Sequence, residues 1–328
     1  MKALTWLMCL LLPLALLSCA KPKATVFLDK SMEEQENVKF CFTGDMGTAS
    51  ETQAAMAEAI KGEECDRLFL LGDLVYPKGI KSIDDEEFKT KFLDFYLPLL
   101  EENPNLIINL VLGNHDHKGK PEAWKRVGEV HERLFFPNYY YMMDYGGLCV
   151  AAFDTSFYYY LNSVSELADQ TAWMQGLQSR LKDCKVKVAL SHHPFKGGGI
   201  ASEDDWEGSS GALKAFLDRY VIGVFDVHIA GHVHIVAYDG KDEGTTMLIS
   251  GAGGEVRGKD KPGFVVLNWQ PGNPRRLGYV IKHVDVTPGV FDDTQYEEAE
   301  SEAEHVINKT HVEDNVLSRF WGRMREVF

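Results

Sequence analysis

Apolar runs of strand length alternate with segments of helical periodicity through the first third of the chain. Three such runs end at a glycine or a short polar turn: Val38–Thr43, Asp66–Leu71 and Leu106–Leu112. Between them, residues 48–61 are rich in alanine, and residues 84–102 carry phenylalanines and leucines at helical spacing. Strand and helix patterns in alternation predict an α/β layered fold.

The second half of the chain predicts a second sheet. Residues 139–143 and 148–153 are expected to form neighbouring strands joined at Gly146-Gly147. The other expected elements are a helix over 168–182, a strand over 186–190, a helix over 211–221, a strand over 224–230, and consecutive antiparallel strands over 234–284 with turns at Gly240, Gly251–Gly254 and Pro271–Gly272. No internal repeat is evident, so we expect two sheets in one globular unit.

The first 19 residues have the features of a bacterial export signal. Met1-Lys2 is positively charged, residues 3–17 are almost entirely apolar, and Leu16-Leu17-Ser18-Cys19 resembles a lipobox. The apolar stretch is short for a membrane-spanning helix. We therefore expect a signal peptide over 1–18, a lipidated Cys19 that anchors the chain to a membrane of the bacterial cell envelope, and a tether over 19–36. The alternative is a hydrophobic first helix of the fold.

Charge and the C-terminal sequence limit the possible partners. The formal net charge is −15, which disfavours nucleic acids as ligands. Residues 287–328 form a tail that begins acidic and ends in an apolar helical stripe flanked by arginines. This stripe is either a terminal helix that packs on the protein or is only loosely ordered, which we favour, or an amphipathic helix on a membrane or partner.

Four cysteines remain once the signal is removed and Cys19 is lipidated. Cys41 and Cys149 lie inside apolar runs and are expected to be buried thiols. Cys65 and Cys184 each precede a strand, and an oxidising compartment would allow a disulfide between them.

Residues that commonly bind metals cluster at the ends of the predicted strands. They are Asp45, Asp73, Tyr76, Asn114, His115, His192, His193, His232 and His234. Carboxyl ends of strands are where open α/β folds build their sites. A mixed set of oxygen and nitrogen donors suits iron, zinc or manganese better than magnesium.

The motifs that contain these residues resemble, in order, the five blocks of the calcineurin-like metallophosphoesterases. They are Gly44-Asp45-x-Gly47, Gly72-Asp73-x-x-Tyr76, Gly113-Asn114-His115-Asp116, Ser191-His192-His193-Pro194 and Gly231-His232-x-His234. The tyrosine of the second block and the residues that flank the blocks resemble the corresponding segments of purple acid phosphatases of the small, tartrate-resistant type. The resemblance covers about residues 38–270. It implies two mixed β-sheets packed as a β-sandwich, flanked by helices on both sides, within a catalytic domain over 37–286.

The resemblance also implies a binuclear metal centre. Asp45, Tyr76 and His234 would hold Fe(III). Asn114, His192 and His232 would hold a divalent ion, either iron, zinc or manganese. Asp73 would bridge the two metals, and a metal-bound hydroxide would attack phosphorus. Tyr76 as an ordinary core aromatic is the alternative at that position.

His115 is the first candidate for contacting phosphate or protonating the leaving group, and His193 is the weaker one. The small mammalian enzymes have a further histidine where this chain has Ala201, so Glu203, Asp204 or Asp205 are other candidates. We expect a monomeric acid phosphatase for small phosphomonoesters. The alternatives are a phosphodiesterase on the same scaffold and a non-catalytic surface-binding protein.

Overall fold

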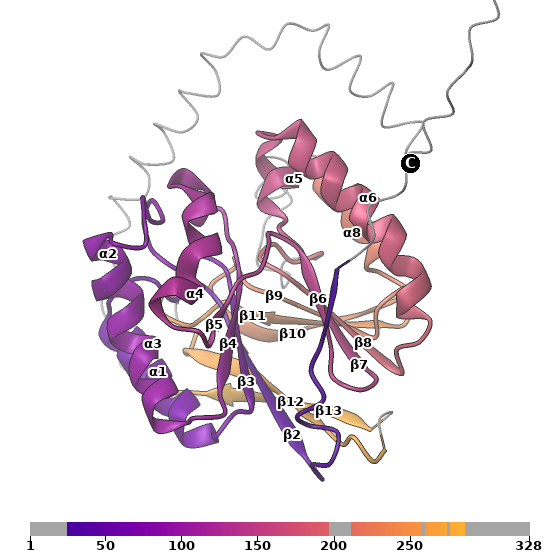
Figure 1. The fold of residues 1–328 in the computed structure, drawn as a ribbon, viewed down its shortest axis with the longest axis horizontal. Helices are drawn as coiled ribbons and strands as arrows, with labels where there is room; N and C mark the ends of the chain where they lie inside the picture. Colours follow the sequence, from indigo (N-terminus) through magenta and orange to yellow (C-terminus); the bar gives the residue numbers. More distant parts are fainter. Residues whose placement is uncertain (1–24, 197–210, 257–259, 274–275, 286–328) are drawn as a thin grey trace, which may run out of the picture.

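The computed structural model describes residues 25–196, 211–256, 260–273 and 276–285 (Figure 1). The predicted signal peptide, the lipidation site at Cys19, the tail over 287–328 and residues 201–205 lie outside these ranges. Among the described residues, no helix combines the length and apolar character that a membrane crossing requires.

Two mixed sheets form the centre of the molecule. Sheet A has seven strands in the order β1 (Val26–Leu28), β6 (Tyr141–Asp144), β7 (Leu148–Ala152), β8 (Val186–Ser191), β9 (Val227–Ala230), β11 (Thr245–Ser250) and β10 (Val236–Asp242). Sheet B has six, in the order β13 (Leu277–His283), β12 (Gly263–Trp269), β2 (Val38–Thr43), β3 (Arg67–Leu71), β4 (Ile107–Val111) and β5 (Leu134–Phe135). Strands β2 to β5 run parallel in sheet B, as do β7, β8, β9 and β11 in sheet A.

Helices cover the outer face of each sheet, so the predicted four-layer architecture is confirmed (Figure 1). The helices are α1 (Glu51–Glu63), α2 (Glu86–Phe88), α3 (Asp94–Glu102), α4 (Val127–Val130), α5 (Ser156–Tyr160), α6 (Val164–Leu181) and α8 (Gly211–Tyr220). A π-helical segment, Lys89–Leu93, connects α2 to α3, so the helix predicted over 84–102 is nearly continuous. The largest apolar cluster fills the space between the sheets and continues through sheet B to α1 and α3, and a second one lies between sheet A and α5, α6 and α8.

The predicted tether over 19–36 is partly wrong, because residues 25–36 belong to the fold. Residues Val26–Leu28 form β1, which pairs in parallel with β6 at the edge of sheet A. Met32 is buried in the main core. A short edge strand within a polar segment gives little periodic signal, which is why the sequence pattern did not reveal it.

The last four strands also differ from the prediction. They form two hairpins, one in each sheet: β10 with β11 in sheet A, and β12 with β13 in sheet B. Gly240 follows a bulge at Asp239 within β10, and the turn lies at Glu243-Gly244. β11 ends at Ser250 in sheet A and β12 begins at Gly263 in sheet B, so the predicted turn at Gly251–Gly254 does not join two strands of one hairpin.

The predicted cysteine chemistry is wrong. Cys41 is bonded to Cys65, and Cys149 is bonded to Cys184. In the first disulfide, Cys41 lies within β2 and Cys65 shortly precedes the neighbouring parallel strand β3. In the second, Cys149 lies within β7 and Cys184 shortly precedes the neighbouring parallel strand β8. Cys65 and Cys184 border different sheets, and a bridge between them is therefore excluded.

Candidate metal centre

The predicted donors meet because the strands before them end at the same edge of the sandwich. Asp45 follows β2, Asp73 follows β3, and Asn114 follows β4 in sheet B. In sheet A, His192 follows β8 and His232 follows β9. Parallel strands place their carboxyl ends together, and the face-to-face packing of the sheets brings the two rows into one pocket.

The backbone at this edge adopts a conformation that side-chain-bearing residues rarely use. Among the described residues, eight other than glycine have positive φ, and four of these are predicted donors: Asp45 (59°), Asp73 (53°), His232 (73°) and His234 (57°). Left-handed conformations at non-glycine residues are unfavourable and concentrate at functional sites. Local strain at four of the donors indicates that the pocket is arranged for something other than stability.

Three donors form one group. Tyr76 Oη donates a hydrogen bond to Asp45 Oδ1 at 3.1 Å and lies 3.2 Å from His234 Nε2. His234 Nε2 is 3.4 Å from the same Asp45 oxygen. Burial alone would lower the pKa of His234, but Asp45 and then Glu255 raise it to about 9. Glu255, whose Oε1 lies 3.6 Å from His234 Nδ1, had no predicted role.

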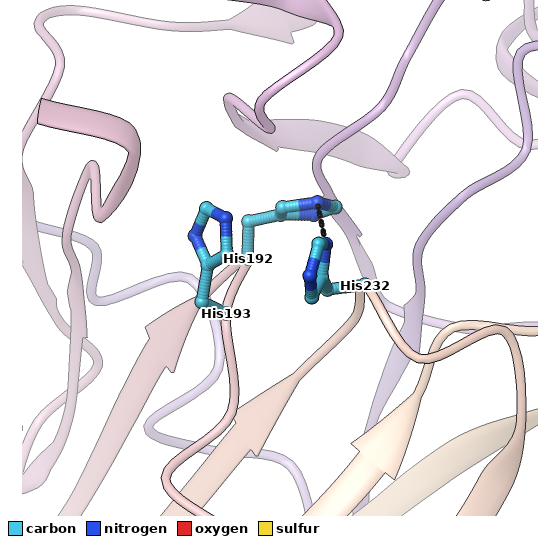
Figure 2. Close-up of side chains that lie close together, drawn as sticks. All are labelled: His192, His193 and His232. Carbon is cyan, nitrogen blue, oxygen red and sulfur yellow. Dashed lines mark hydrogen bonds between the residues drawn. The ribbon is translucent and has the colours of Figure 1, made fainter. Parts of the chain in front are cut away.

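Asn114, His192 and His232 form the second group. His192 Nδ1 lies 2.8 Å from the Leu71 carbonyl oxygen, which can only accept, so Nδ1 carries the proton. Nε2 of the neutral ring then carries a lone pair. It lies 2.9 Å from Asn114 Oδ1. It also lies 3.3 Å from His232 Nδ1 (Figure 2). Electron pairs that converge in this way fit a bound cation.

Asp73 lies between the two groups. Its Oδ1 accepts the backbone N–H of His115 at 2.8 Å, while Oδ2 is buried, makes no hydrogen bond among the described residues and lies 3.5 Å from His192 Nε2. Donor atoms of Asp45, Asp73 and His192 all fall within 4.8 Å of one another. Burial opposes the negative charge, but His192 and His115 hold the pKa of Asp73 below its usual value. A buried carboxylate oxygen without a partner fits a position between two cations.

The sequence did not predict any role for Asp116, although it belongs to the third motif. Its Oδ1 accepts the Leu74 N–H at 3.0 Å and its Oδ2 accepts the Gly113 N–H at 2.8 Å. Burial, followed by the charge of Asp73, raises the pKa of Asp116 well above its usual value. Through these hydrogen bonds, Asp116 links the loop after β3 to the loop after β4 and so fixes the distance between Asp73 and Asn114.

The two predicted catalytic histidines lie on opposite sides of the pocket. His115 Nδ1 lies 2.7 Å from the Pro77 carbonyl oxygen, and Nε2 is 4.0 Å from Asp73 Oδ2. His193 lies beside His192 and His232 (Figure 2), and its Nδ1 is 2.8 Å from Thr155 Oγ1. Burial, reinforced by neighbouring histidines, lowers the pKa of His193 well below its usual value, so the ring is neutral.

Asp154 and His117 form a buried pair that the sequence did not reveal. Asp154 Oδ1 accepts the N–H of Ser156, two residues further along the chain, at 3.0 Å. Its Oδ2 also lies 2.7 Å from His117 Nε2, and both side chains are almost fully buried. The pair connects the loop after β4 in sheet B to the loop after β7 in sheet A.

A buried histidine under the pocket predicts acid sensitivity of the metal-free protein. His228 Nε2 lies 2.8 Å from Ser191 Oγ, and burial lowers its pKa from 6.5 to about 4. The unfolded chain therefore binds this proton below pH 6.5 while the folded chain does not, so stability falls between pH 6.5 and 4, by about 3 kcal/mol. Urea unfolding across this range should give a flatter pH dependence for His228→Gln than for the parent. Parallel curves would contradict the prediction.

Comparison with known proteins agrees with this arrangement. A family model of calcineurin-like phosphoesterases matches residues 38–236. Purple acid phosphatase 4 of Arabidopsis thaliana is 25% identical over 251 residues, which cover 66% of this chain and 68% of that protein. Tartrate-resistant acid phosphatase type 5 of Mus musculus is 24% identical over 274 residues, 77% of this chain and 80% of that protein. The solved structure of GAP50, described as the anchor in the inner membrane complex of Plasmodium, aligns with a TM-score of 0.56 at 17% identity, covering 80% of this chain and 94% of that one. At this identity the last match supports the fold alone.

Proposed function

Because the chain belongs to the calcineurin-like phosphoesterase family, we propose that it is an exported acid phosphatase that hydrolyses phosphomonoesters at a binuclear centre of Fe(III) and a divalent metal. The distant similarity to plant and mammalian acid phosphatases supports this choice within the family.

The observation that carries the proposal is the position of Tyr76. Its hydroxyl lies within 3.2 Å of both Asp45 and His234 and is buried at the wall of the pocket. A core aromatic would not need to place its only polar atom against two predicted metal donors. A phenolate and a carboxylate are hard anionic donors that favour Fe(III), which supports a ferric ion on this side.

The second ion would be held by Asn114, His192 and His232, with Asp73 shared between both. Neutral amide and imidazole donors suit a divalent ion. When bound, a pair of such ions neutralises phosphate charge and makes water acidic enough to supply a nucleophile below neutral pH. The complete donor set also disfavours a purely non-catalytic binding protein, which has no need of seven converging donors.

We propose His115 as the residue that protonates the leaving group. The Pro77 carbonyl oxygen can only accept, so Nδ1–H donates to it and Nε2 faces the pocket. In the imidazolium form, the proton on Nε2 can pass to the departing alkoxide oxygen as the bond from phosphorus to that oxygen breaks. Burial lowers the pKa of His115, which makes the ring a stronger acid at the working pH.

Substrate class is decided by comparing turnover of p-nitrophenyl phosphate with that of bis-p-nitrophenyl phosphate. The proposal expects the monoester to be hydrolysed with the higher kcat/KM, with an acidic pH optimum. Preference for the diester would favour the phosphodiesterase alternative. No turnover of either compound by protein that contains two metals per chain would favour the non-catalytic one.

Tyr76→Phe tests the ferric site directly. The parent protein should contain iron and show a broad visible absorption from tyrosinate-to-iron charge transfer, and the variant should lose this band. Tyr141→Phe removes another fully buried hydroxyl, which donates to the Leu110 carbonyl oxygen at 2.9 Å, and should keep the band. A colourless, iron-free and active parent would refute the ferric assignment.

Export to an oxidising compartment is supported by the two disulfides. Structural disulfides are rare in reducing cytosol and common in exported proteins. Lipidation at Cys19 would then hold the catalytic domain at a membrane surface.

A further inference from the structure

Two buried polar atoms in the pocket make no hydrogen bond among the described residues, and they have opposite requirements. Asp73 Oδ2 is an acceptor, and a cation satisfies it. His193 Nε2 is the other, and it belongs to a side chain that is 1% exposed. Leaving a buried polar group unsatisfied is costly, so each such group indicates a partner that is absent from the protein itself.

Thr155 determines which nitrogen of His193 carries the proton. Thr155 Oγ1 accepts the backbone N–H of His193 at 3.2 Å and lies 2.8 Å from Nδ1 of the same residue. The hydroxyl is fully buried and has one proton, and Nδ1 is its only acceptor among the described residues. Nδ1 therefore accepts, and in the neutral ring the proton is on Nε2.

The ring is held so that this proton points into the pocket. Tyr159 of α5 stacks on His193 with ring centroids 4.7 Å apart and an interplanar angle of 15°. On the other side, a ring nitrogen of His193 lies within 4.8 Å of ring nitrogens of His192 and His232 (Figure 2). No carboxylate lies within 4.0 Å of the His193 ring in the described part of the chain, so the donor needs an acceptor from outside.

We propose that His193 Nε2–H is a fixed hydrogen-bond donor to a phosphoryl oxygen of the substrate, positioned by Thr155 and Tyr159, and that it is not a metal ligand. A metal would need the lone pair at Nε2, and the Thr155 hydroxyl keeps that nitrogen protonated. An anion bound to a cation between His192 and His232 would satisfy the donor. The identity of the anion rests on the proposed function, whereas the position of the proton on the His193 ring does not.

The tautomer is measured first, in the metal-free protein. Nitrogen-15 NMR of histidine-labelled protein should show His193 with a protonated Nε2 and an unprotonated Nδ1, the signals being assigned by their loss in His193→Gln. Thr155→Val removes the hydroxyl and should shift the ring toward the Nδ1–H form. A parent ring protonated at Nδ1 would overturn the proposal.

Binding of inorganic phosphate to the metal-loaded protein then tests the role. His193→Phe should keep the metal content of the parent and bind phosphate about 10- to 100-fold more weakly, as expected for the loss of a hydrogen bond to a charged group. His193→Gln keeps an N–H donor and should recover part of the affinity, while Tyr141→Phe, which removes a buried hydroxyl that bonds the Leu110 carbonyl oxygen, should stay near the parent. Loss of one metal per chain in His193→Phe would show that His193 is a metal ligand. Unchanged phosphate affinity would show that His193 does not bind phosphate. Either result overturns the proposal.

This result is separable from the proposed function. If the parent binds phosphate through His193 but does not turn over p-nitrophenyl phosphate, the acid phosphatase assignment fails while the donor assignment stands. If the His193→Phe variant hydrolyses the monoester and binds phosphate as tightly as the parent, the donor assignment fails alone.

Discussion

Asp73→Asn should lower kcat for a phosphomonoester by about 10³-fold or more while leaving the protein folded. The substitution keeps the shape of the side chain and the acceptor that the His115 N–H uses at 2.8 Å. It removes the charge on Oδ2, the buried oxygen that faces His192 and lies between the two donor groups. Removing a single well-placed electrostatic group from an active site typically costs 10²–10³ in rate, and a bridging ligand affects two ions at once.

The measurement combines kcat for p-nitrophenyl phosphate, metal content per chain and thermal unfolding of the metal-free protein. Asp29→Asn is the matched control, because Asp29 pairs with Arg67 at 2.6 Å and is largely buried, yet it lies beside β1 and far from the donors. The control should lose some stability and keep its metals and its kcat. An Asp73→Asn variant that retains a tenth of the parent activity would contradict the assignment of Asp73 as a bridging ligand.

Removal of both disulfides should leave the domain largely unfolded at 37 °C. Cys41–Cys65 closes a sequence separation of 24 residues, and Cys149–Cys184 closes one of 35. Chain-entropy estimates for loops of these lengths are about 3–4 kcal/mol each. Their sum, about 7 kcal/mol, is comparable to the whole stability of an ordinary domain, which is about 5–15 kcal/mol.

Guanidinium unfolding of the two double Cys→Ala variants and of the quadruple variant checks this result. Each double variant should stay folded with a lower midpoint, and the quadruple variant should show no cooperative transition at 37 °C. Thiol labelling of the denatured, unreduced parent should detect none of the four cysteines. Reaction of all four, or a quadruple variant as stable as the parent, would contradict the prediction.

The sequence alone predicted the seven donors that the fold brings together, although it did not predict the groups that support them. Asp45, Asp73 and Asn114 were identified because each follows an apolar run, and the ends of parallel strands meet at one edge of a sheet. This inference needs only local order along the chain, namely where a strand ends and what comes next. For the same reason the longer helices and the central strands were predicted within a few residues of their observed bounds, whereas the short helices α4 and α5 were not predicted.

Only the tertiary structure decided which distant residues touch one another. The cysteine pairs depend on the register of β2 with β3 and of β7 with β8, and hydrophobic periodicity does not specify that register. The pairing of β1 with β6 joins segments more than a hundred residues apart in the sequence, and it requires β6 to lie at the edge of sheet A where β1 can bind it.

The same limit applies to the groups that support the donors. Asp116 fastens two loops together, Thr155 sets the proton on His193, and Asp154 pairs with His117, and each of these contacts depends on where two loops meet in space. A motif states which side chain is available at a strand end. The orientation of that side chain, its protonation and any hydrogen-bonding atom left without a partner are decided by the packing of one sheet against the other. Only that packing brings the two rows of strand ends into one pocket.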